Sequence, residues 1–338
     1  MTEHTRPELS GRHQHWADSD LAKSIAPRRS FGTHKWEVGG MVVIAGSPSY
    51  IGAAQLCSRS AGRSGAGIVY LAAPRQVINV IAAAIPEVAH IPLGSTDTLA
   101  GVRHALGELG DSLRRARAVV LGPGVTTDEG ASTLLAALFG VSDHGRNSPM
   151  SIGFAASQAV KEETESSEAL LFANLDATVV VDADGLNWLA KQDNWWTKVP
   201  EGRMILTPHP GEMARLLRLD DPDEVIADPI AMVERAAKEW KQTVILKYGH
   251  TAASNGERTV VAEDAPVSLA TAGSGDVFAG MVGAFAAQGL APIDAAALAL
   301  HIGPRAARRG EQRFGAFGLI AIDLPDAIAL ELATLTDE

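Results

Sequence analysis

Short runs of apolar, mostly β-branched residues recur along the chain from about residue 40 onward. Most of these runs are apolar throughout, which is typical of strands buried on both faces of a sheet. Such strands favour a parallel sheet that helices cover on both sides. The runs are MVVIA from Met41, IVYLA from Ile68, AVVL from Ala118, TVVVD from Thr178, RMILT from Arg203, TVILK from Thr243 and RTVVA from Arg258.

Helix-like segments lie between most of these runs, and two more close the chain. Strands that alternate with helices predict an α/β fold with a mostly parallel central sheet and helices on both faces, in three α/β/α layers. Pro292 suits the first turn of the last of these helices. Helices are expected at 51–63, 98–116, 128–139, 211–218, 229–240, 276–288 and 292–309.

Two stretches break this rhythm. Residues 1–33 are polar and have no apolar period, which predicts a loosely held N-terminal arm. Residues 140–168 are polar, small and turn-rich, which predicts a surface insertion that is mobile or functional. We therefore expect a single domain over residues 34–338 that carries this insertion.

Composition and charge narrow the class of protein. The chain has 338 residues, of which 46% are hydrophobic, and a net charge of -11. That charge disfavours nonspecific binding to nucleic acid or to an acidic membrane. Cys57 is the single cysteine, which excludes an internal disulfide and suits a reducing compartment. No secretory signal is visible and no apolar run is long enough to span a bilayer, so we expect a cytoplasmic protein.

The segment LATAGSGDVFAG places three small residues directly before an acid and a predicted helix. Backbone N–H groups at a helix N-terminus attract anions, and glycines let a phosphate approach the main chain. We therefore predict an anion cradle formed by Ala272, Gly273, Ser274 and Gly275. Asp276 would be a general base beside it. The alternative is that Asp276 is only a favourable acid in a first helical turn.

Five other turns follow or adjoin predicted strands. The glycine-rich turns at 45–56 and 121–125 allow close approach of a ligand, and KYGHT, from Lys247 to Thr251, is a plausible phosphate loop. TPHPGE at 207–212 places His209 on a rigid turn, and DADGLN at 182–187 supplies two acids and an amide. Each could instead be an ordinary strand exit or helix cap. Together they predict a ligand site at the carboxyl edge of the sheet.

The ordered motifs GSxxYxGA, GPG, DADGLN, TPHPGE, KxGxT and AGSGDVxAG make the chain similar to the NAD(P)H-hydrate dehydratases of the ribokinase-like superfamily. The similarity extends from about His34 to Leu324. It implies a ribokinase-like fold and an ADP- or ATP-dependent dehydration of the S epimer of NADHX or NADPHX, with Mg²⁺ as cofactor. Many family members are homotetramers. Tyr248 stands where the family usually has glycine.

The resemblance also assigns roles to residues. Asp276 would deprotonate the ring hydroxyl, which attacks the terminal phosphorus, and phosphate would then leave with help from the ring nitrogen. The implied substrate residues are Ala53, Gly124, His209 and Asp276, the implied nucleotide residues are Lys247, Tyr248, Gly249, His250, Thr251 and Gly275, and the supporting residues are Asp184, Asn187 and Glu212.

Three alternatives differ in class. A small-molecule kinase of the same superfamily would use the same aspartate and cradle on a hydroxymethylpyrimidine, a thiazole or a sugar alcohol. A noncatalytic nucleotide-binding protein would not need Asp276 and Lys247 together. A metal hydrolase is disfavoured, because the histidines do not fall at metal-ligand spacings such as HExxH.

Overall fold

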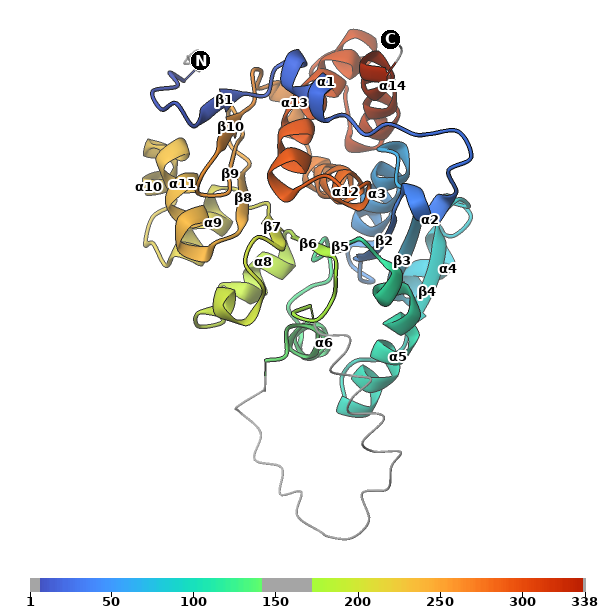
Figure 1. Cartoon of the computed structure of the whole chain (residues 1–338). Helices are drawn as coiled ribbons and strands as arrows, with labels where there is room; N and C mark the ends of the chain where they lie inside the picture. The colour runs from blue at the N-terminus through green and yellow to red at the C-terminus, as the bar shows by residue number, and fades with distance from the viewer. Residues whose placement is uncertain (1–6, 142–171, 337–338) are drawn as a thin grey trace.

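The strands join into one ten-stranded sheet in the computed structural model, which describes residues 7–141 and 172–336 (Figure 1). The strands are β1 (Gln14–Trp16), β2 (Gly40–Ile44), β3 (Ile68–Pro74), β4 (Ala89–Leu93), β5 (Ala118–Leu121), β6 (Thr178–Val181), β7 (Met204–Leu206), β8 (Thr243–Leu246), β9 (Ala252–Ser254) and β10 (Thr259–Val261). Their order is β1-β10-β9-β8-β7-β6-β5-β2-β3-β4. Neighbours are parallel except in the pairs β8–β9 and β9–β10, so the predicted mostly parallel sheet is confirmed.

All seven predicted strands are present, and β1, β4 and β9 are additional. The sequences of these three lack a continuous run of β-branched residues: QHW, AHIPL and AAS. β1 and β4 are the two edge strands of the sheet, where polar residues and Pro92 are tolerated. β9 is held by antiparallel pairing on both sides rather than by its own propensity.

The two faces of the sheet belong to separate hydrophobic cores, which explains why the strands are apolar throughout. In β2, Met41 and Val43 pack into one core, whereas Val42 and Ile44 pack into the other. Successive side chains of a strand point to opposite faces, so a strand covered on both sides needs apolar residues at every position.

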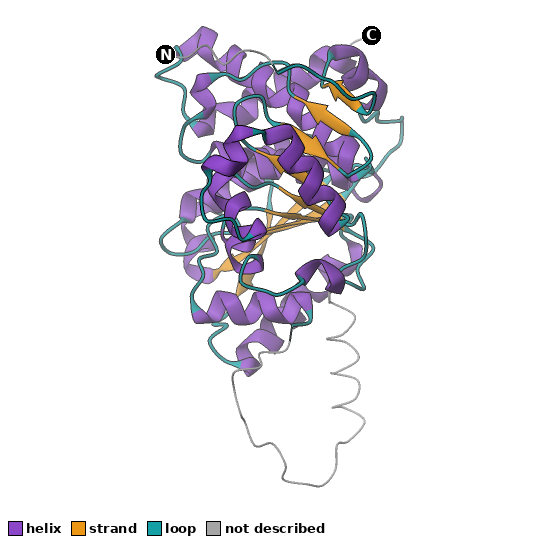
Figure 2. Ribbon diagram, turned by 90° about the vertical axis from the view of Figure 1, so that its left-hand side faces the viewer, coloured by secondary structure: helices purple, strands orange, loops and turns teal. Residues whose placement is uncertain are grey.

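Helices cover both faces of the sheet (Figure 2). The first core is covered by α1 (Ser19–Ile25), α3 (Ile51–Arg63), α4 (Arg75–Ile81), α12 (Ser274–Ala287), α13 (Pro292–Phe314) and α14 (Leu324–Thr336). The second core is covered by α5 (Leu99–Arg115), α6 (Glu129–Phe139), α8 (Asp184–Leu189), α9 (Pro210–Leu217), α10 (Asp223–Ala227) and α11 (Pro229–Trp240). The seven predicted helices are all present. Six others in the described part of the chain were not predicted: α1, α4, α8, α10, the short α2 (Lys35–Val38) before β2, and α14, which follows the two helices that were expected to close the chain. Across the described ranges, every helix is too short or too polar to cross a membrane.

Residues 14–25 are held firmly against the sheet, so the expectation of a loosely held arm is wrong for this part of residues 1–33. β1 pairs in parallel with β10, and α1 buries Ala22. His301 of α13 donates a hydrogen bond from Nδ1 to the carbonyl oxygen of Ala17 at 2.8 Å. These elements are too short to give an apolar period, which is why their packing was not visible in the sequence. The division into an arm and a single domain stays a prediction.

The predicted insertion at 140–168 lies almost entirely outside the described residues. The two ends that border it are close together. The N–H of Phe172 donates to the carbonyl oxygen of Leu138 at 2.9 Å, and the rings of Phe139 and Phe172 meet edge to face with centroids 5.0 Å apart. The described residues on either side of it therefore meet at the C-terminal end of α6.

The parallel strands bring the predicted turns to one edge of the sheet. β2, β5, β6, β7 and β8 run in the same direction, so the loops that follow them meet at their carboxyl ends. This is the edge at which open α/β sheets bind ligands.

Candidate active site

The first residues after three adjacent strands form a buried polar network. Asp182 follows β6, Thr207 follows β7 and Lys247 follows β8. The Nζ atom of Lys247 lies 2.5 Å from Oδ1 of Asp182, and the Thr207 hydroxyl donates to the same oxygen at 2.7 Å. The Asp182 side chain is only 2% exposed. The ammonium group of Lys247 and the hydroxyl group of Thr207 therefore stabilise the buried carboxylate of Asp182, as water would do at the surface.

The predicted anion cradle lies beside this network. α12 begins at Ser274, and the N–H groups of a first helical turn have no acceptor within the helix. A Cβ at Gly275 would lie 3.4 Å from Nζ of Lys247, so the backbone at Gly275 lies next to the ammonium. Gly273 has a φ of 88°, a left-handed conformation that favours glycine. The loop thus presents backbone donors next to a cation, which is the chemistry of a phosphate site.

Ser274 lies at the predicted cradle, and its side chain bonds to the loop that precedes it. Its hydroxyl donates to the carbonyl oxygen of Leu269 at 2.7 Å, and its backbone N–H donates to the carbonyl oxygen of Thr271 at 3.3 Å. Both bonds fold the preceding loop back onto the helix terminus. The side chain of Ser274 therefore shapes the cradle.

Asp276 lies in the first turn of α12, and its carboxyl group is suited to accept a proton near neutral pH. Burial raises the pKa of Asp276 to about 7, the negative charge of Asp182 adds to this, Lys247 opposes it, and Asp184 contributes a smaller increase. A base with a pKa near the working pH combines adequate basicity with a substantial ionised fraction. The environment thus favours a base over a mere helix-terminal acid.

Lys247 keeps its positive charge in this setting. Burial lowers the pKa of Lys247, but the charges of Asp182 and Glu212 and the hydrogen bond to Asp182 outweigh burial, so the pKa is raised overall. The ammonium group is therefore a fixed cation at the cradle.

His209 and Glu212 cap α9 reciprocally. His209 Nδ1 accepts a hydrogen bond from the N–H of Gly211 at 3.0 Å, and Glu212 Oε2 accepts one from the N–H of His209 at 2.9 Å. Burial lowers the pKa of His209, and the charges of Lys247 and Arg215 act in the same direction. Burial also raises the pKa of the Glu212 carboxyl. The imidazole is thus held neutral, with its ring fixed by the cap.

Two of the predicted substrate residues lie in contact. Gly124 has a φ of 64°, and a Cβ there would lie 2.9 Å from Cβ of Ala53 and 2.6 Å from Cβ of Tyr50. Only glycine therefore lets the loop after β5 lie against the start of α3. The next loop is tied to it, because Asp184 Oδ2 accepts a hydrogen bond from the N–H of Thr126 at 2.9 Å.

A cavity of about 580 Å³ opens beside the cradle, within the usual size of small-molecule pockets. The predicted site residues that line it are His209, Lys247, Tyr248, Gly249, Thr251, Ser274 and Gly275. His250 does not line it. Its Nδ1 donates to the carbonyl oxygen of Ala262 at 2.9 Å, and its ring lies edge-on to Trp16 at 6.4 Å. The His250 side chain therefore secures the loop against β1 and β10, contrary to our expectation that it faces the nucleotide.

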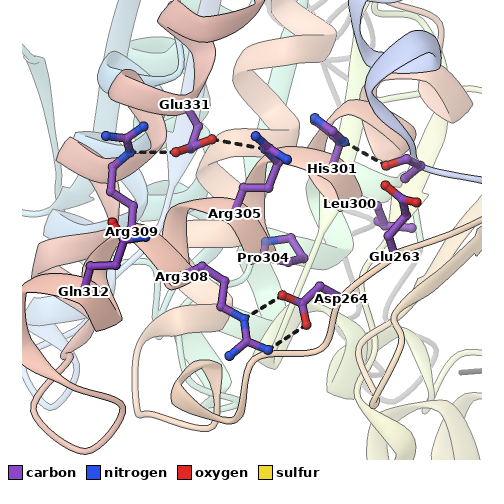
Figure 3. Close-up of a pocket in the computed structure, with 11 residues that line it drawn as sticks. Glu263, Asp264, Leu300, His301, Pro304, Arg305, Arg308, Arg309, Gln312 and Glu331 are labelled. Atoms are coloured by element: carbon purple, nitrogen blue, oxygen red, sulfur yellow. Dashed lines mark hydrogen bonds and ion pairs between the residues drawn. The ribbon is translucent and has the colours of Figure 1, made fainter. Parts of the chain in front are cut away.

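Asp264 forms part of the wall of this cavity and of a second cavity, of about 440 Å³. Leu300 and Pro304 of α13 line both as well. Arg308 donates to the two carboxylate oxygens of Asp264 at 2.6 and 2.8 Å (Figure 3). These hydrogen bonds lower the pKa of Asp264 and hold its carboxylate ionised at the boundary between the two cavities.

The second cavity is built around an almost buried glutamate. Glu331 of α14 is 6% exposed and accepts hydrogen bonds from Nε of Arg309 at 2.6 Å and from Nε of Arg305 at 3.1 Å (Figure 3). Both arginines belong to α13. The network thus ties the last two helices together behind the nucleotide-sized cavity.

The expected Mg²⁺ fits this site only in one coordination mode. Within residues 7–141 and 172–336, no group of three or more His, Cys, Asp or Glu side chains is arranged to hold a metal ion. Mg²⁺ at phosphoryl-transfer sites usually keeps several waters and binds one or two carboxylates together with substrate phosphates. Asp276, in the first turn of the helix that begins at the cradle, is one carboxylate that could take part in such a mode.

A cradle at a helix N-terminus, a partly buried cation and a carboxyl group with a raised pKa form an arrangement suited to phosphoryl transfer, at the carboxyl edge of a mostly parallel sheet. Solved structures show that the fold is ribokinase-like. One match is a solved ribokinase-like superfamily protein of Enterococcus faecalis V583, with a TM-score of 0.75 and 16% sequence identity. The superposition includes 98% of this chain and 99% of that protein. Another is the ADP/ATP-dependent NAD(P)H-hydrate dehydratase of Bacillus subtilis, co-crystallised with ATP/Mg²⁺, with a TM-score of 0.70 and 20% sequence identity. Here the superposition includes 96% of this chain and 100% of that protein.

The family model described as NAD(P)H-hydrate dehydratase matches residues 41–144 and 160–330. The chain therefore belongs to the NAD(P)H-hydrate dehydratase family. The bifunctional NAD(P)H-hydrate repair enzyme Nnr of Salinibacter ruber is 32% identical over 305 residues, which are 89% of this chain and 49% of that protein. The chain thus spans about half the length of the curated relatives that it matches.

Two members of the buried network, Asp182 and Thr207, were not among the individually predicted site residues. Asp182 and Thr207 are the first residues of the DADGLN and TPHPGE motifs, but the interpretation of those motifs centred on later positions. The available signal was their place: each directly follows a strand that lies beside its neighbour in the sheet.

Proposed function

We propose that this chain is an ADP- or ATP-dependent NAD(P)H-hydrate dehydratase that returns the S epimer of NADHX or NADPHX to NADH or NADPH. Membership of the family supports this function. One structural observation supports it most directly, namely the position of Asp276. This carboxyl group, with a pKa of about 7, lies in the first turn of α12, directly after Gly275, which is next to the ammonium of Lys247.

In the proposed reaction, Asp276 takes the proton of the ring hydroxyl while that oxygen attacks the terminal phosphorus of the nucleotide. The bond from phosphorus to the nucleotide oxygen breaks and releases AMP from ADP, or ADP from ATP. The carbon–oxygen bond of the ring then breaks as the nitrogen lone pair moves in, and inorganic phosphate leaves. A proton lost from the neighbouring ring carbon restores the dihydronicotinamide.

In the proposed reaction, different residues of the chain have different roles. The backbone N–H groups of residues 272–275 stabilise charge on the transferring phosphoryl group. Lys247 neutralises nucleotide phosphate, with Asp182 holding its ammonium in place. Tyr248, Gly249 and Thr251 line the nucleotide side. Ala53, Gly124 and His209 contact the dinucleotide. A bound Mg²⁺ would share the phosphate charge.

The test of this function is the fate of the phosphate. The protein is incubated with chemically prepared NADHX or NADPHX and with ADP, ATP or no nucleotide. We expect NADH or NADPH and inorganic phosphate in equal amounts, and only when nucleotide is present. The kinase alternative predicts a stable phosphorylated product from a hydroxymethylpyrimidine, a thiazole or a sugar. Formation of such a product faster than the conversion of NADHX would contradict the dehydratase and favour the kinase.

We also propose a cytoplasmic homotetramer. The family resemblance supports the tetramer, and the burial of the single cysteine, Cys57, is in keeping with a reducing compartment. Light scattering coupled to gel filtration measures the mass: four times 35.4 kDa is expected, and a monomer would contradict it.

A further inference from the structure

A third cavity, of about 430 Å³, lies at the carboxyl edge of the sheet and shares no lining residue with the nucleotide cavity. It lies between the loop after β5 and helices α8 and α9. Its lining residues are Thr127, Asp184, Asn187, Ala190, Lys191 and Arg215. It therefore adjoins the loops of the proposed substrate side, and two of its six residues are cations.

These two cations have no carboxylate partner among the described residues. Arg215 donates from Nε to Oδ1 of Asn187 at 3.0 Å, which fixes the guanidinium plane and leaves its Nη groups available. Lys191 makes no side-chain hydrogen bond or ion pair with the described part of the chain. Arg218, three residues after Arg215, is by contrast paired with Asp193. The lysine of the nucleotide cavity and the arginines of the second cavity are likewise each paired with a carboxylate.

The acid in the same cavity links it to the proposed reaction centre. Asp184 accepts the N–H of Thr126 at 2.9 Å and forms no ion pair with Lys191 or Arg215. The negative charge of Asp184 acts on Asp276, so the cavity lies within electrostatic reach of the proposed base. The charge that remains unbalanced in the cavity is positive, which favours an anionic ligand.

We propose that Lys191 and Arg215 bind a phosphate group of the dinucleotide substrate. This inference rests on the proposed function, because it names the part of that substrate which the cavity takes. A guanidinium fixed by Asn187 and a flexible ammonium are a suitable pair for phosphate oxygens. The phosphate has two sources: the diphosphate bridge, which both hydrates contain, and the 2′-phosphate, which only NADPHX contains.

The experiment compares the wild-type protein with Lys191→Gln, Arg215→Gln and the double variant. Steady-state KM and kcat are measured for NADHX and NADPHX at low ionic strength. Binding of NADH and NADPH is measured in parallel by fluorescence, which needs no turnover. Lys198→Gln and Arg218→Gln are the matched controls, since each removes one exposed cation of the same type that does not line this cavity.

We expect the double variant to raise KM and weaken binding about tenfold to a hundredfold, as the loss of charge-assisted hydrogen bonds does. Equal losses for both ligands identify the diphosphate, and a loss confined to NADPHX and NADPH identifies the 2′-phosphate. The losses should shrink as salt is added. Unchanged binding of both NADH and NADPH overturns the subsite. Failure of the wild type to convert either hydrate refutes the proposed function instead, and the binding measurements then still decide the subsite.

Discussion

The Nζ atom of Lys247 lies 2.5 Å from Oδ1 of Asp182, at the ends of two strands that are separated by β7 in the sheet. This ion pair connects both halves of the proposed reaction. Its ammonium lies beside Gly275 at the cradle, and its two charges act in opposite directions on the carboxyl group of Asp276. Changes to either partner should therefore be measurable at the proposed base.

Asp276→Asn should lower kcat by about 100- to 10,000-fold, because it removes the general base while keeping the size of the side chain. Nucleotide affinity should stay nearly unchanged. The folded-state pKa of about 7 lies above the ordinary value of 3.8 for Asp, so the carboxyl group destabilises the fold progressively between about pH 4 and pH 7, and to its full extent above pH 7. The variant should therefore have a higher Tm than the wild type at about pH 8, and the gain should vanish below about pH 4. A variant with near wild-type kcat would exclude Asp276 as the base.

The pH profile should report the same carboxyl group. Below about pH 7, kcat/KM is expected to fall about tenfold per pH unit as Asp276 becomes protonated. Asp182→Asn removes the negative charge that contributes most to the raised pKa after burial, so the acid limb should move to lower pH. Thr207→Val serves as the control, because it removes a hydrogen bond to Asp182 and no charge. If the acid limb does not move in Asp182→Asn, the charge of Asp182 does not control the pKa of the group that titrates in this limb.

Lys247→Ala should raise the KM for nucleotide more than the KM for NADHX, because the ammonium lies at the cradle and lines the nucleotide cavity. Loss of its charge should also move the acid limb to higher pH, opposite to the shift in Asp182→Asn. Lys241→Ala is a suitable control, since Lys241 is exposed and paired with Glu201. Equal ADP and ATP affinities in wild type and Lys247→Ala, measured by calorimetry, would place the phosphate site elsewhere.

The sequence predicted the sheet and the edge at which the turn motifs meet, because continuous apolar runs and turn motifs are local signals. It did not predict the relations that give the site its chemistry. Asp182 and Lys247 are 65 positions apart and meet only because β6, β7 and β8 lie side by side. His250 belongs to the same loop as Lys247, yet its ring lies against Trp16 of a strand too short to be recognised. The Lys247–Asp182 ion pair and the position of the His250 ring therefore both depend on how distant strands come together in the sheet, which local sequence patterns do not reveal.

Glu331→Gln should destabilise the fold by about 1–3 kcal/mol, because Glu331 is 6% exposed and accepts hydrogen bonds from Arg305 and Arg309. Urea unfolding measures the change. Asp326→Asn is the matched control on the same helix: it also faces two arginines but is 54% exposed, and exposed pairs contribute less than about 1 kcal/mol. Equal losses in the two variants would show that burial of Glu331 does not strengthen its ion pairs.

Replacement of residues 142–171 by a short Gly/Ser linker should keep kcat and KM within about tenfold of the wild type. The bordering residues Leu138 and Phe172 are already joined by a hydrogen bond of 2.9 Å, so a short connection can close the gap without strain. α6 starts near the substrate side, where Thr127 lines the third cavity, and its 11 residues carry the chain roughly 16 Å away before the replaced segment begins. Steady-state kinetics and light scattering on the shortened protein test this. A folded product of unchanged mass that has lost activity would mean that the replaced segment reaches back to complete the site, and a changed mass would assign it to a contact between subunits.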